Sequence, residues 1–424
     1  MPSLSATATP AATPTLTPTP SLRVTATPAA TATLAPTPTA KPTVAPSGNG
    51  RFTLTGSMTV ARTRHTATLL QDGRVLIAGG SGKSWGSPSL ASAELYGPST
   101  GKFTSTGSMH VARAGHTATL LQGRPGPHHG GHSSGLGSPW TNAGSTAPDM
   151  GLPLASAELY DPTTGKFSLT GSMTAARDSH SATLLQDGRV LIVGGYDCSE
   201  VTSCNDLMSA ELYNPATGTF TPTGSVEACG GPATLLNDGR VLVVDGCEGS
   251  AQLYDPGTGT FGRWPAGWSY EMAGATSDAV GSLTLLKDGR VLLAGGYTQV
   301  PEFAPRLLNS AYVYDPSTGR FSQTGSMTKA RARLSTTLLP DGRVLVAGGG
   351  DFLWCRAHSC RSSDSSSADL YNPATGRFEL AQPMNVGCFD HTATLLRDGR
   401  VLIAGGYGGA SSGACLSSAE LYSI

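Results

Sequence analysis

The chain has 424 residues, of which 13% are charged and 6% aromatic, with 55 glycines and 29 prolines. This composition is typical of turn-rich β proteins and argues against a helical fold. The formal net charge of −1 gives the chain no overall attraction for nucleic acid, so we expect no nucleic-acid partner. No apolar run approaches the roughly 20 residues that cross a bilayer, so we expect no direct membrane insertion by this sequence.

Residues 1–49 are rich in Thr, Ala and Pro and carry only two charges, at Arg23 and Lys41. Such a segment buries too little apolar surface to order itself, and dense Thr-Pro pairs favour extended polyproline-II conformations. We therefore predict a disordered stalk or linker over residues 1–49 and a folded domain over residues 50–424. Since the stalk lacks the apolar core of a secretory signal, we expect an export signal or anchor upstream of Met1.

Three short motifs recur along residues 50–424 with a period of about 54 residues. The tyrosine motif occurs seven times, and the gap between the first two D-G-R-V-L motifs spans two periods, which indicates seven repeats. D-G-R-V-L begins at Asp72, Asp187, Asp238, Asp288, Asp341 and Asp398; A-E-L-Y or a close variant ends at Tyr96, Tyr160, Tyr213, Tyr254, Tyr314, Tyr371 and Tyr422; T-G-x-F ends at Phe103, Phe167, Phe220, Phe261, Phe321 and Phe378.

Each repeat predicts four short strands, called a to d. H-T-A-T-L-L is strand a, an Asp-Gly hairpin turn follows, and R-V-L-I-A-G-G is strand b. S-A-E-L-Y is strand c, D-P-x-T-G is a second turn, and F-x-x-T-G-S-M is strand d. Strand b is apolar on both faces, as in residues 75–78, so it needs cover on both sides. This pattern predicts an all-β fold, a seven-bladed β-propeller of four-stranded antiparallel blades.

The last repeat ends shortly after Tyr422, before any strand d, whereas residues 51–58 read as a strand d without its own strands a, b and c. We therefore predict that residues 51–58 complete the last blade and close the ring, which removes the open edge of a linear stack.

These features resemble the kelch-repeat family, and in particular bacterial, galactose-oxidase-like kelch propellers without the copper site. The resemblance implies a β-propeller but no single function. Strand d carries Phe where the family more often has Trp, and the fourth repeat has Val244-Asp245-Gly246 in place of a double glycine. The motif residues that carry the resemblance are the strand-c tyrosines, the strand-d aromatics and the glycine pairs Gly79-Gly80, Gly194-Gly195, Gly295-Gly296, Gly348-Gly349 and Gly405-Gly406.

The second repeat lacks a recognisable strand b. Residues 122–131 read Q-G-R-P-G-P-H-H-G-G, and two prolines do not fit a central strand. Codons exist for this stretch that, after loss of one nucleotide, read Q-D-G-R-V-L-I-T-G, so we hypothesise a pair of compensating frameshifts over the segment up to Pro153. The clustered His128, His129 and His132 suggest a metal site, but no regular element sets their geometry, and we predict none.

In an antiparallel blade, the a–b and c–d turns lie on one face of the ring, here called the turn face, and the b–c and d–a connections lie on the other, the connection face. The turns are nearly constant, whereas the connections vary in length. Variable loops on a rigid scaffold are the usual place for binding residues, and flat aromatic rings suit sugars or protein side chains. We predict ligand-binding roles for Trp85, Trp264, Trp268, Tyr270 and Trp354, although such residues also often pack loops down.

The eight cysteines form four pairs by position, all on the connection face, and predict local disulfides and an oxidising compartment. Zinc is the alternative, but no C-x-x-C spacing occurs. Sequence alone does not prove connectivity. The pairs are Cys198 with Cys204, Cys229 with Cys247, Cys355 with Cys360, and Cys388 with Cys415.

We find no catalytic constellation. R-x-x-H precedes strand a at Arg62/His65, Arg113/His116 and Arg177/His180; because a catalytic set is normally unique within a ring, we assign these residues to hydrogen bonding between blades. Copper radical oxidases similar to galactose oxidase need a crosslinked Tyr–Cys pair near the axis, whereas the tyrosines here belong to strand c. The strand-c glutamates (Glu94, Glu158, Glu211 and Glu420) are expected to pair with an arginine of the D-G-R turn.

We therefore predict an exported or surface-tethered, non-catalytic binding module, a monomer without cofactor, that recognises a glycan or a protein through its connection face. The alternative is a carbohydrate-active oxidase or lyase with its site at the central channel. A third possibility, an intracellular scaffold, predicts reduced cysteines.

Overall fold

The computed structural model describes residues 48–82, 87–121, 128–129, 153–200, 203–227, 231–244, 251–262, 280–300, 303–352, 362–408 and 414–424. The chain divides into two units, Met1–Val44 and Ala45–Ile424, and all described residues belong to the second unit. These residues form strands and turns without a helix. The all-β prediction is therefore confirmed for the described part of the chain.

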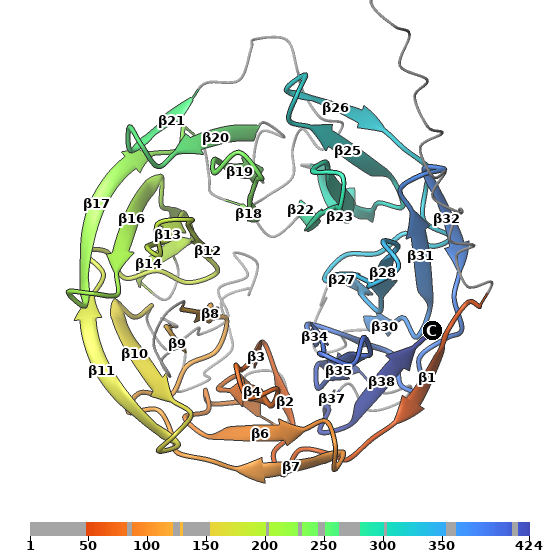
Figure 1. Cartoon of the computed structure of the whole chain (residues 1–424), viewed down its shortest axis with the longest axis horizontal. Helices are drawn as coiled ribbons and strands as arrows, with labels where there is room; N and C mark the ends of the chain where they lie inside the picture. The colour runs from red at the N-terminus through yellow and green to blue at the C-terminus, as the bar shows by residue number, and fades with distance from the viewer. Residues whose placement is uncertain are drawn as a thin grey trace, which may run out of the picture. The chain divides into compact units, whose positions relative to one another are not determined.

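Six sheets repeat one antiparallel strand order, and their first strands surround a central opening (Figure 1). This arrangement is that of a β-propeller, in which each sheet is a blade. In order from strand a to strand d, the sheets are β3 (Thr66–Leu69), β4 (Val75–Ala78), β6 (Ala93–Gly97) and β7 (Lys102–Ser105); β12 (Ser181–Leu184), β13 (Val190–Val193), β16 (Ser209–Asn214) and β17 (Thr219–Ser225); β18 (Ala233–Leu235), β19 (Val241–Val244), β20 (Ala251–Asp255) and β21 (Thr260–Gly262); β22 (Val280–Leu285), β23 (Val291–Val300), β25 (Ala311–Asp315) and β26 (Arg320–Gln323); β27 (Ser335–Leu338), β28 (Val344–Ala347), β31 (Ala368–Asn372) and β32 (Arg377–Leu380); and β34 (Thr392–Leu395), β35 (Val401–Ala404), β38 (Ala419–Ser423) and β1 (Arg51–Leu54).

The second repeat differs from the others, because its strands form two separate two-stranded sheets. β8 (Thr119–Leu120) pairs with β9 (His128–His129), and β10 (Ser156–Asp161) pairs with β11 (Lys166–Ser172). Accessory strands occur in the connections of other repeats: β2 (Arg62–Thr63), β5 (Ser81–Gly82), β14 (Tyr196–Glu200), β15 (Ser203–Asp206), β24 (Phe303–Leu307), β29 (Gly350–Phe352), β30 (Ser362–Asp364), β33 (Cys388–Phe389), β36 (Tyr407–Gly408) and β37 (Ala414–Cys415).

The last sheet combines the two ends of the folded unit. β1 pairs antiparallel with β38, with Phe52 opposite Tyr422 and their ring centroids 4.9 Å apart. The strand is shorter than the predicted range 51–58: after Leu54 the amides of Thr55 and Met58 still donate to the carbonyls of Ala419 and Ser417, while the backbone between them also contacts the first blade. There the amide of Gly56 donates to the carbonyl of Gly101 at 2.9 Å.

Strand b is buried on both faces in six blades, as its sequence predicts. Val75 and Ile77 pack in one apolar cluster with Leu402 and Ala404 of the last blade, and the alternate residues of β4 belong to a different cluster, on the other side of the blade. Because each blade contributes half of two clusters, no blade has a complete core of its own.

The repeated Tyr and Phe residues form one ring contact in each repeat. The strand-c tyrosine packs on the strand-d phenylalanine beside it in all seven repeats, at centroid distances from 4.7 to 5.0 Å. The tyrosine hydroxyl then reaches the preceding blade: Tyr160 Oη lies 2.8 Å from Thr106 Oγ1. Next to that threonine, a Cβ on Gly107 would meet the carbonyl oxygen of Gly165 at 2.2 Å. The T-G pair is therefore a close contact between blades.

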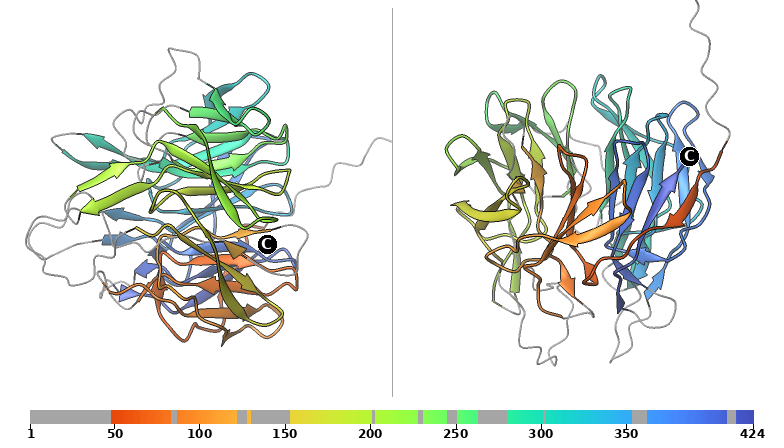
Figure 2. Two further views of the ribbon diagram at one scale, coloured as in Figure 1. Left: turned by 90° about the vertical axis from the view of Figure 1, so that its left-hand side faces the viewer. Right: turned by 60° about the horizontal axis from the view of Figure 1, so that its bottom comes forward.

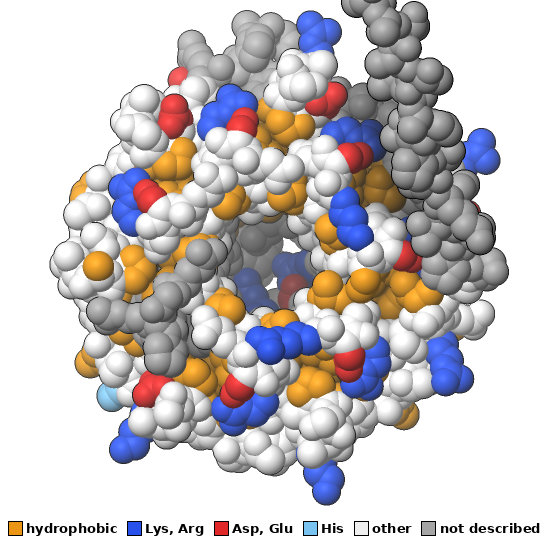
Figure 3. All heavy atoms as spheres, in the orientation of Figure 1, with side chains coloured by type: hydrophobic (Ala, Val, Ile, Leu, Met, Phe, Trp, Pro, Cys, Tyr) orange, Lys and Arg blue, Asp and Glu red, His pale blue; other side chains and the backbone are white. Residues whose placement is uncertain are grey.

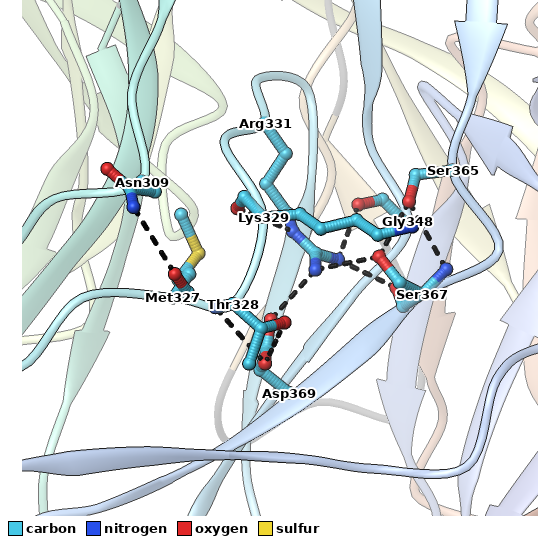
Figure 4. A network of polar contacts seen from close by, with 9 residues as sticks. All are labelled: Asn309, Met327, Thr328, Lys329, Arg331, Gly348, Ser365, Ser367 and Asp369. Atoms are coloured by element: carbon cyan, nitrogen blue, oxygen red, sulfur yellow. Dashed lines mark hydrogen bonds and ion pairs between the residues drawn. The ribbon is translucent and has the colours of Figure 1, made fainter.

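An arginine before strand a fastens each of four blades to its predecessor. The side chain of Arg331 donates to the carbonyls of Gly348 and Ser367 and to Asp369 Oδ2, at 3.0, 2.7 and 2.8 Å (Figure 4). Its backbone carbonyl accepts from Gly296 of the previous blade at 3.0 Å. Arg62, Arg113 and Arg177 repeat this arrangement with Glu94, Glu158 and Glu211, and all four guanidinium groups are buried.

These contacts confirm that the R-x-x-H arginines join neighbouring blades, and they correct the prediction for the glutamates. The D-G-R arginines pair with the aspartate of their own turn instead, as Arg74 does with Asp72 at 2.6 Å. Glu420 pairs with no arginine among the described residues: it accepts from the backbone amides of Asn385 and Val386, at 2.9 and 2.8 Å, and from the Asn385 side chain.

We expect Arg62→Met to lower the free energy of unfolding by about 3–5 kcal/mol, because it leaves Glu94 buried without its cation. Arg74→Met is the matched control, since its pair with Asp72 is exposed and worth about 0–1 kcal/mol. Adding Glu94→Gln to Arg62→Met should recover much of the loss. Urea denaturation of the full chain measures all three variants, and equal losses for Arg62→Met and Arg74→Met would contradict the role of the buried pair.

Candidate functional site

The connection face carries most of the variation in the ring. The paired strands β14–β15 and β23–β24 extend beyond the blades on one side (Figure 2), and β29–β30 and β33–β36–β37 add shorter pairings in other repeats. In these repeats, the number of residues between strand b and strand c ranges from 14, after Ala404, to 20, after Ala347. The blades thus hold a set of different hairpins at one face, as expected for a rigid scaffold with variable loops.

The turn face is uniform by contrast. Each D-G-R turn holds an arginine against its own aspartate, and Figure 3 shows such acidic and basic side chains side by side around the central opening. The same arginines reach the next blade, as Arg290 does at the carbonyl of Pro373, 3.1 Å away. This face repeats one structural contact around the ring.

The five aromatic residues predicted to bind ligand, Trp85, Trp264, Trp268, Tyr270 and Trp354, all lie outside the described residues, so their role stays a prediction. Two other aromatics of the connections contact the protein itself: Tyr297 packs on an apolar cluster, and Tyr407 lies 5.3 Å from Phe389, measured between ring centroids. Packing within the connections therefore accounts for the aromatic side chains at these two positions.

The predicted disulfide between Cys388 and Cys415 is wrong, because β36 lies between the strands that carry them, β33 and β37. Two strand spacings amount to about 9.5 Å, whereas the Cα atoms of a disulfide lie about 4.4–6.8 Å apart. Both residues are buried and are not bonded to each other. Cys415 Sγ contacts the carbonyl oxygen of Gly82 at 3.6 Å, and burial raises its pKa to about 11.

The other three predicted pairs stay predictions. Cys198 and Cys204 lie on the paired strands β14 and β15, which agrees with a local pair, but nothing is described of their side chains. Cys229, Cys247, Cys355 and Cys360 lie outside the described residues.

A set of residues in five of the repeats, here called the axial residues, precedes the R-x-x-H histidine position and lies where the d–a connection turns into strand a. Arg64, Ser179, Arg333 and Asp390 all have positive φ, from 52° to 54°, and Gly115 takes the same place with φ 63°. Left-handed backbone costs a residue with a side chain about 1–2 kcal/mol. Four such residues at one place in the repeat indicate that the ring fixes this conformation.

Backbone hydrogen bonds link the axial residues of adjacent blades. Asp390 donates its amide to Arg333, Arg64 to Asp390, and Gly115 to Arg64, at 3.4, 3.3 and 2.9 Å. The side chains of Arg333 and Asp390 also form an ion pair at 3.0 Å and are 18% and 17% exposed. Basic and acidic groups are visible inside the central opening (Figure 3). The axis therefore presents guanidinium donors and a carboxylate at partly exposed positions.

The sequence analysis missed this set, although a signal was present. Both middle positions of the R-x-x-H motif change from repeat to repeat, and the residue before His is Arg64, Gly115 or Ser179; in the last repeat, where Cys388 replaces the arginine, it is Asp390. A position that varies inside a constant frame is the pattern expected for a binding residue on a scaffold.

The histidines that follow the axial residues connect neighbouring blades. Their Nε2 atoms lie 2.7–3.1 Å from a hydroxyl of the preceding blade, which confirms the structural role predicted for the R-x-x-H histidines. Burial lowers the pKa of His116 and His180 to about 3 and that of His391 to about 4, so these side chains are neutral at pH 7. Nearby arginine charge adds to the effect for His116 and His180. The pairs are His65 with Thr392, His116 with Thr66, His180 with Thr117 and His391 with Ser335.

The comparisons with known proteins give a motif and a fold. Residues 284–328 match the family model of the Kelch motif. The fold matches 831 chains of solved structures, and among them is one described as a "Novel fungal alcohol oxidase with catalytic diversity among the AA5 family, in complex with copper". It is 17% identical, with a TM-score of 0.64, over 89% of this chain and 76% of that chain. No curated protein sequence matches.

The chain therefore contains a Kelch motif in a kelch-type β-propeller fold, and at 17% identity the likeness to the oxidase concerns the fold alone. The described part of the chain contains no helix long and apolar enough to cross a membrane.

The described histidine and tyrosine side chains are engaged by contacts between and within blades. The Nε2 atoms of the four histidines before strand a lie at Thr or Ser hydroxyls, and the strand-c tyrosines pack against phenylalanine. Within the described ranges, no three His, Cys, Asp or Glu side chains are placed to hold a metal ion.

We expect the stability of the protein to fall as the pH drops below 6.5. The folded pKa values of the buried histidines lie below the unfolded value, so the unfolded chain takes up protons first and is favoured from about pH 6.5 down to pH 3–4. At pH 5 each such histidine costs about 2 kcal/mol. In His116→Gln, the loss of unfolding free energy between pH 7 and pH 5 should be smaller by about that amount.

Urea denaturation at both pH values measures this difference, which does not depend on the absolute stability of the variant. Lys102→Gln, at an exposed position of β7, serves as control and should follow the wild type. If His116→Gln loses as much unfolding free energy between pH 7 and pH 5 as the wild type, the lowered pKa of buried His116 is refuted.

Proposed function

We propose that this protein is a non-catalytic binding module that recognises a glycan or another protein through the connection face of a seven-bladed propeller. In this proposal the second repeat counts as a blade, and the pairing of β1 with β38 closes the ring. Closure supports the function because it fixes the spacing of hairpins that belong to repeats far apart in the sequence.

The observation that carries the proposal is the contrast between the two faces. The turn face repeats the same ion pairs and turns, whereas the connection face varies among the described repeats in sequence and in strand pairing, through β14–β15, β24, β29–β30 and β36–β37. Where residues only hold the blades together, the same turn and ion pair recur from repeat to repeat, as on the turn face. Variation restricted to one face of a scaffold is what recognition of a ligand requires.

The axial residues suggest which chemistry the centre of this face offers. The pair Arg333–Asp390, with Arg64 in the neighbouring blade, combines guanidinium donors with a carboxylate acceptor. Such groups bind hydroxyls and carboxylates in fixed directions. Aromatic side chains of the surrounding loops, Trp264 and Trp268 among them, would supply flat apolar contacts for a sugar ring or a protein side chain.

We further propose that the module is a monomer that acts outside the cell or at its surface, held there by the Thr/Pro-rich residues 1–49. The composition of that segment supports a spacer. The three untested cysteine pairs would fit an oxidising compartment, where local disulfides tie down exposed loops.

The alternative is a carbohydrate-active oxidase or lyase acting at the central channel. The observation in its favour is the fold shared with a copper-containing alcohol oxidase. Metal analysis of the purified full chain separates the two functions. We expect less than stoichiometric copper for a binding module, and a stoichiometric content would favour the enzyme.

A glycan array tests the binding face. Labelled full-length protein should bind a defined set of glycans, and Trp268→Ala should lose most of that signal because a stacking ring is removed. Gln186→Ala is the control, since Gln186 is exposed beside an Asp-Gly turn on the opposite face. Identical profiles for the wild type and Trp268→Ala would rule out the proposed contact.

A further inference from the structure

Three charged residues lie next to one another at the axis. Strand a is the innermost strand of each blade, so the axial residue that precedes it borders the central opening (Figure 1). In the last two blades and the first, this residue is Arg333, Asp390 and Arg64. One backbone hydrogen bond joins Asp390 to Arg333 and another joins Arg64 to Asp390, at 3.4 and 3.3 Å. Such pairing places the backbones of neighbours about 5 Å apart.

The backbone at these three positions favours glycine, yet each position carries a charged side chain. Arg64, Arg333 and Asp390 have φ of 54°, 54° and 52°, and the second repeat has a glycine at the same place, Gly115 with φ 63°. Glycine adopts this conformation without the steric cost that a Cβ atom adds. Because glycine would serve the fold at lower cost, the charged side chains indicate a function beyond the fold.

The contacts within this trio leave two groups available to a ligand. Arg333 Nη1 and Asp390 Oδ2 form an ion pair at 3.0 Å. Within the described ranges, no side chain forms a hydrogen bond or ion pair with the Arg64 guanidinium or with Asp390 Oδ1. Both residues are partly exposed. The trio has two positive charges and one negative charge, so one further anion would balance it.

The two available groups require different partners. A guanidinium binds a carboxylate through two parallel hydrogen bonds, whereas a carboxylate oxygen accepts only from a donor such as a hydroxyl. A neutral sugar offers no charge to Arg64, and a peptide of acidic residues brings its anions against Asp390. A sugar acid has a carboxylate and several hydroxyls on one ring, so it satisfies both groups at once.

We propose that the axis binds a sugar acid, the uronic acid unit of a glycan, with its carboxylate on Arg64 and one of its hydroxyls on Asp390. Arg333 is a positioning residue, because its ion pair holds the Asp390 side chain. This inference rests on the proposed function and narrows it, since it names the class of glycan that the connection face recognises.

Matched pairs of tetrasaccharides test the need for a carboxylate. The probes are tetrasaccharides of galacturonate, mannuronate and hyaluronan, each with a carboxyl-reduced form that keeps the linkages and the other hydroxyls. We expect at least one acidic tetrasaccharide to bind the full-length protein saturably in isothermal titration calorimetry. Its reduced form should bind at least tenfold more weakly, because Arg64 then has no charged partner.

Arg64→Gly separates a binding role from a structural one. It introduces the residue that the second repeat has at this place, so the variant should be at least as stable in urea as the wild type. Its affinity for the acidic tetrasaccharide should nevertheless fall at least tenfold. Arg74→Gln is the control, because the ion pair of Arg74 lies on the turn face, and it should bind like the wild type.

Asp390→Asn tests the selection against acidic peptides. The wild type should not bind tetraglutamate, whereas Asp390→Asn should, because the variant no longer places a negative charge beside the arginines. A gain of binding of this kind does not arise from a variant that fails to fold.

Four results would overturn the sugar-acid site: no binding of any acidic tetrasaccharide, equal binding of the acidic and reduced forms, undiminished binding by a folded Arg64→Gly variant, or tetraglutamate binding by the wild type as tight as that of the sugar acid. The glycan array keeps the proposed function separate from this inference. If neutral glycans bind there while these tests fail, the binding module stands and only the sugar-acid site is lost.

Discussion

The fold depends on one constraint, the burial of strand b on both faces. A strand such as Val75–Ala78, with every residue buried, cannot be covered within a single four-stranded blade, so it requires a neighbour on each side. The other contacts between blades are consequences of this stacking. The arginine before strand a, the strand-c tyrosine and the histidine before strand a each belong to one blade and form a hydrogen bond with the preceding blade. Stability is therefore a property of interfaces, as in repeat proteins generally.

Much of the fold could be predicted from the sequence, because its periodic features have local causes. Asp-Gly turns, the two-faced strand b and the Tyr and Phe of strands c and d predict the strands and their order. The cysteines show where this reasoning fails. Cys388 and Cys415 flank strands a and b, which suggested adjacency, but the accessory strand Tyr407–Gly408 separates them. Periodicity does not predict such insertions, because they belong to a single repeat.

The candidate site was less predictable than the fold for a related reason. The sequence analysis gave weight to conspicuous aromatic side chains in the loops, such as Trp268, and treated the R-x-x-H motif as one structural unit. The structure divides that motif by position: Arg62 and His65 are buried between blades, whereas Arg64 lies in the left-handed region at the axis. A backbone conformation of this kind has no signature in composition or spacing, so only the variation among repeats was available to indicate it.

The repeats also indicate how a buried ion pair is replaced when one partner is lost. The fourth repeat has no arginine between Val226 and Ala233, and its strand c carries the neutral Gln252, which accepts from the amide of Glu227 at 3.2 Å. In the last repeat, Cys388 stands four residues after Met384, where four other repeats have arginine, yet the carboxylate Glu420 is kept. There the Asn385 side chain and two backbone amides take the place of the guanidinium. One solution removes the charge and the other surrounds it with donors, and both avoid a buried carboxylate without partners, which would cost more than the lost pair contributes.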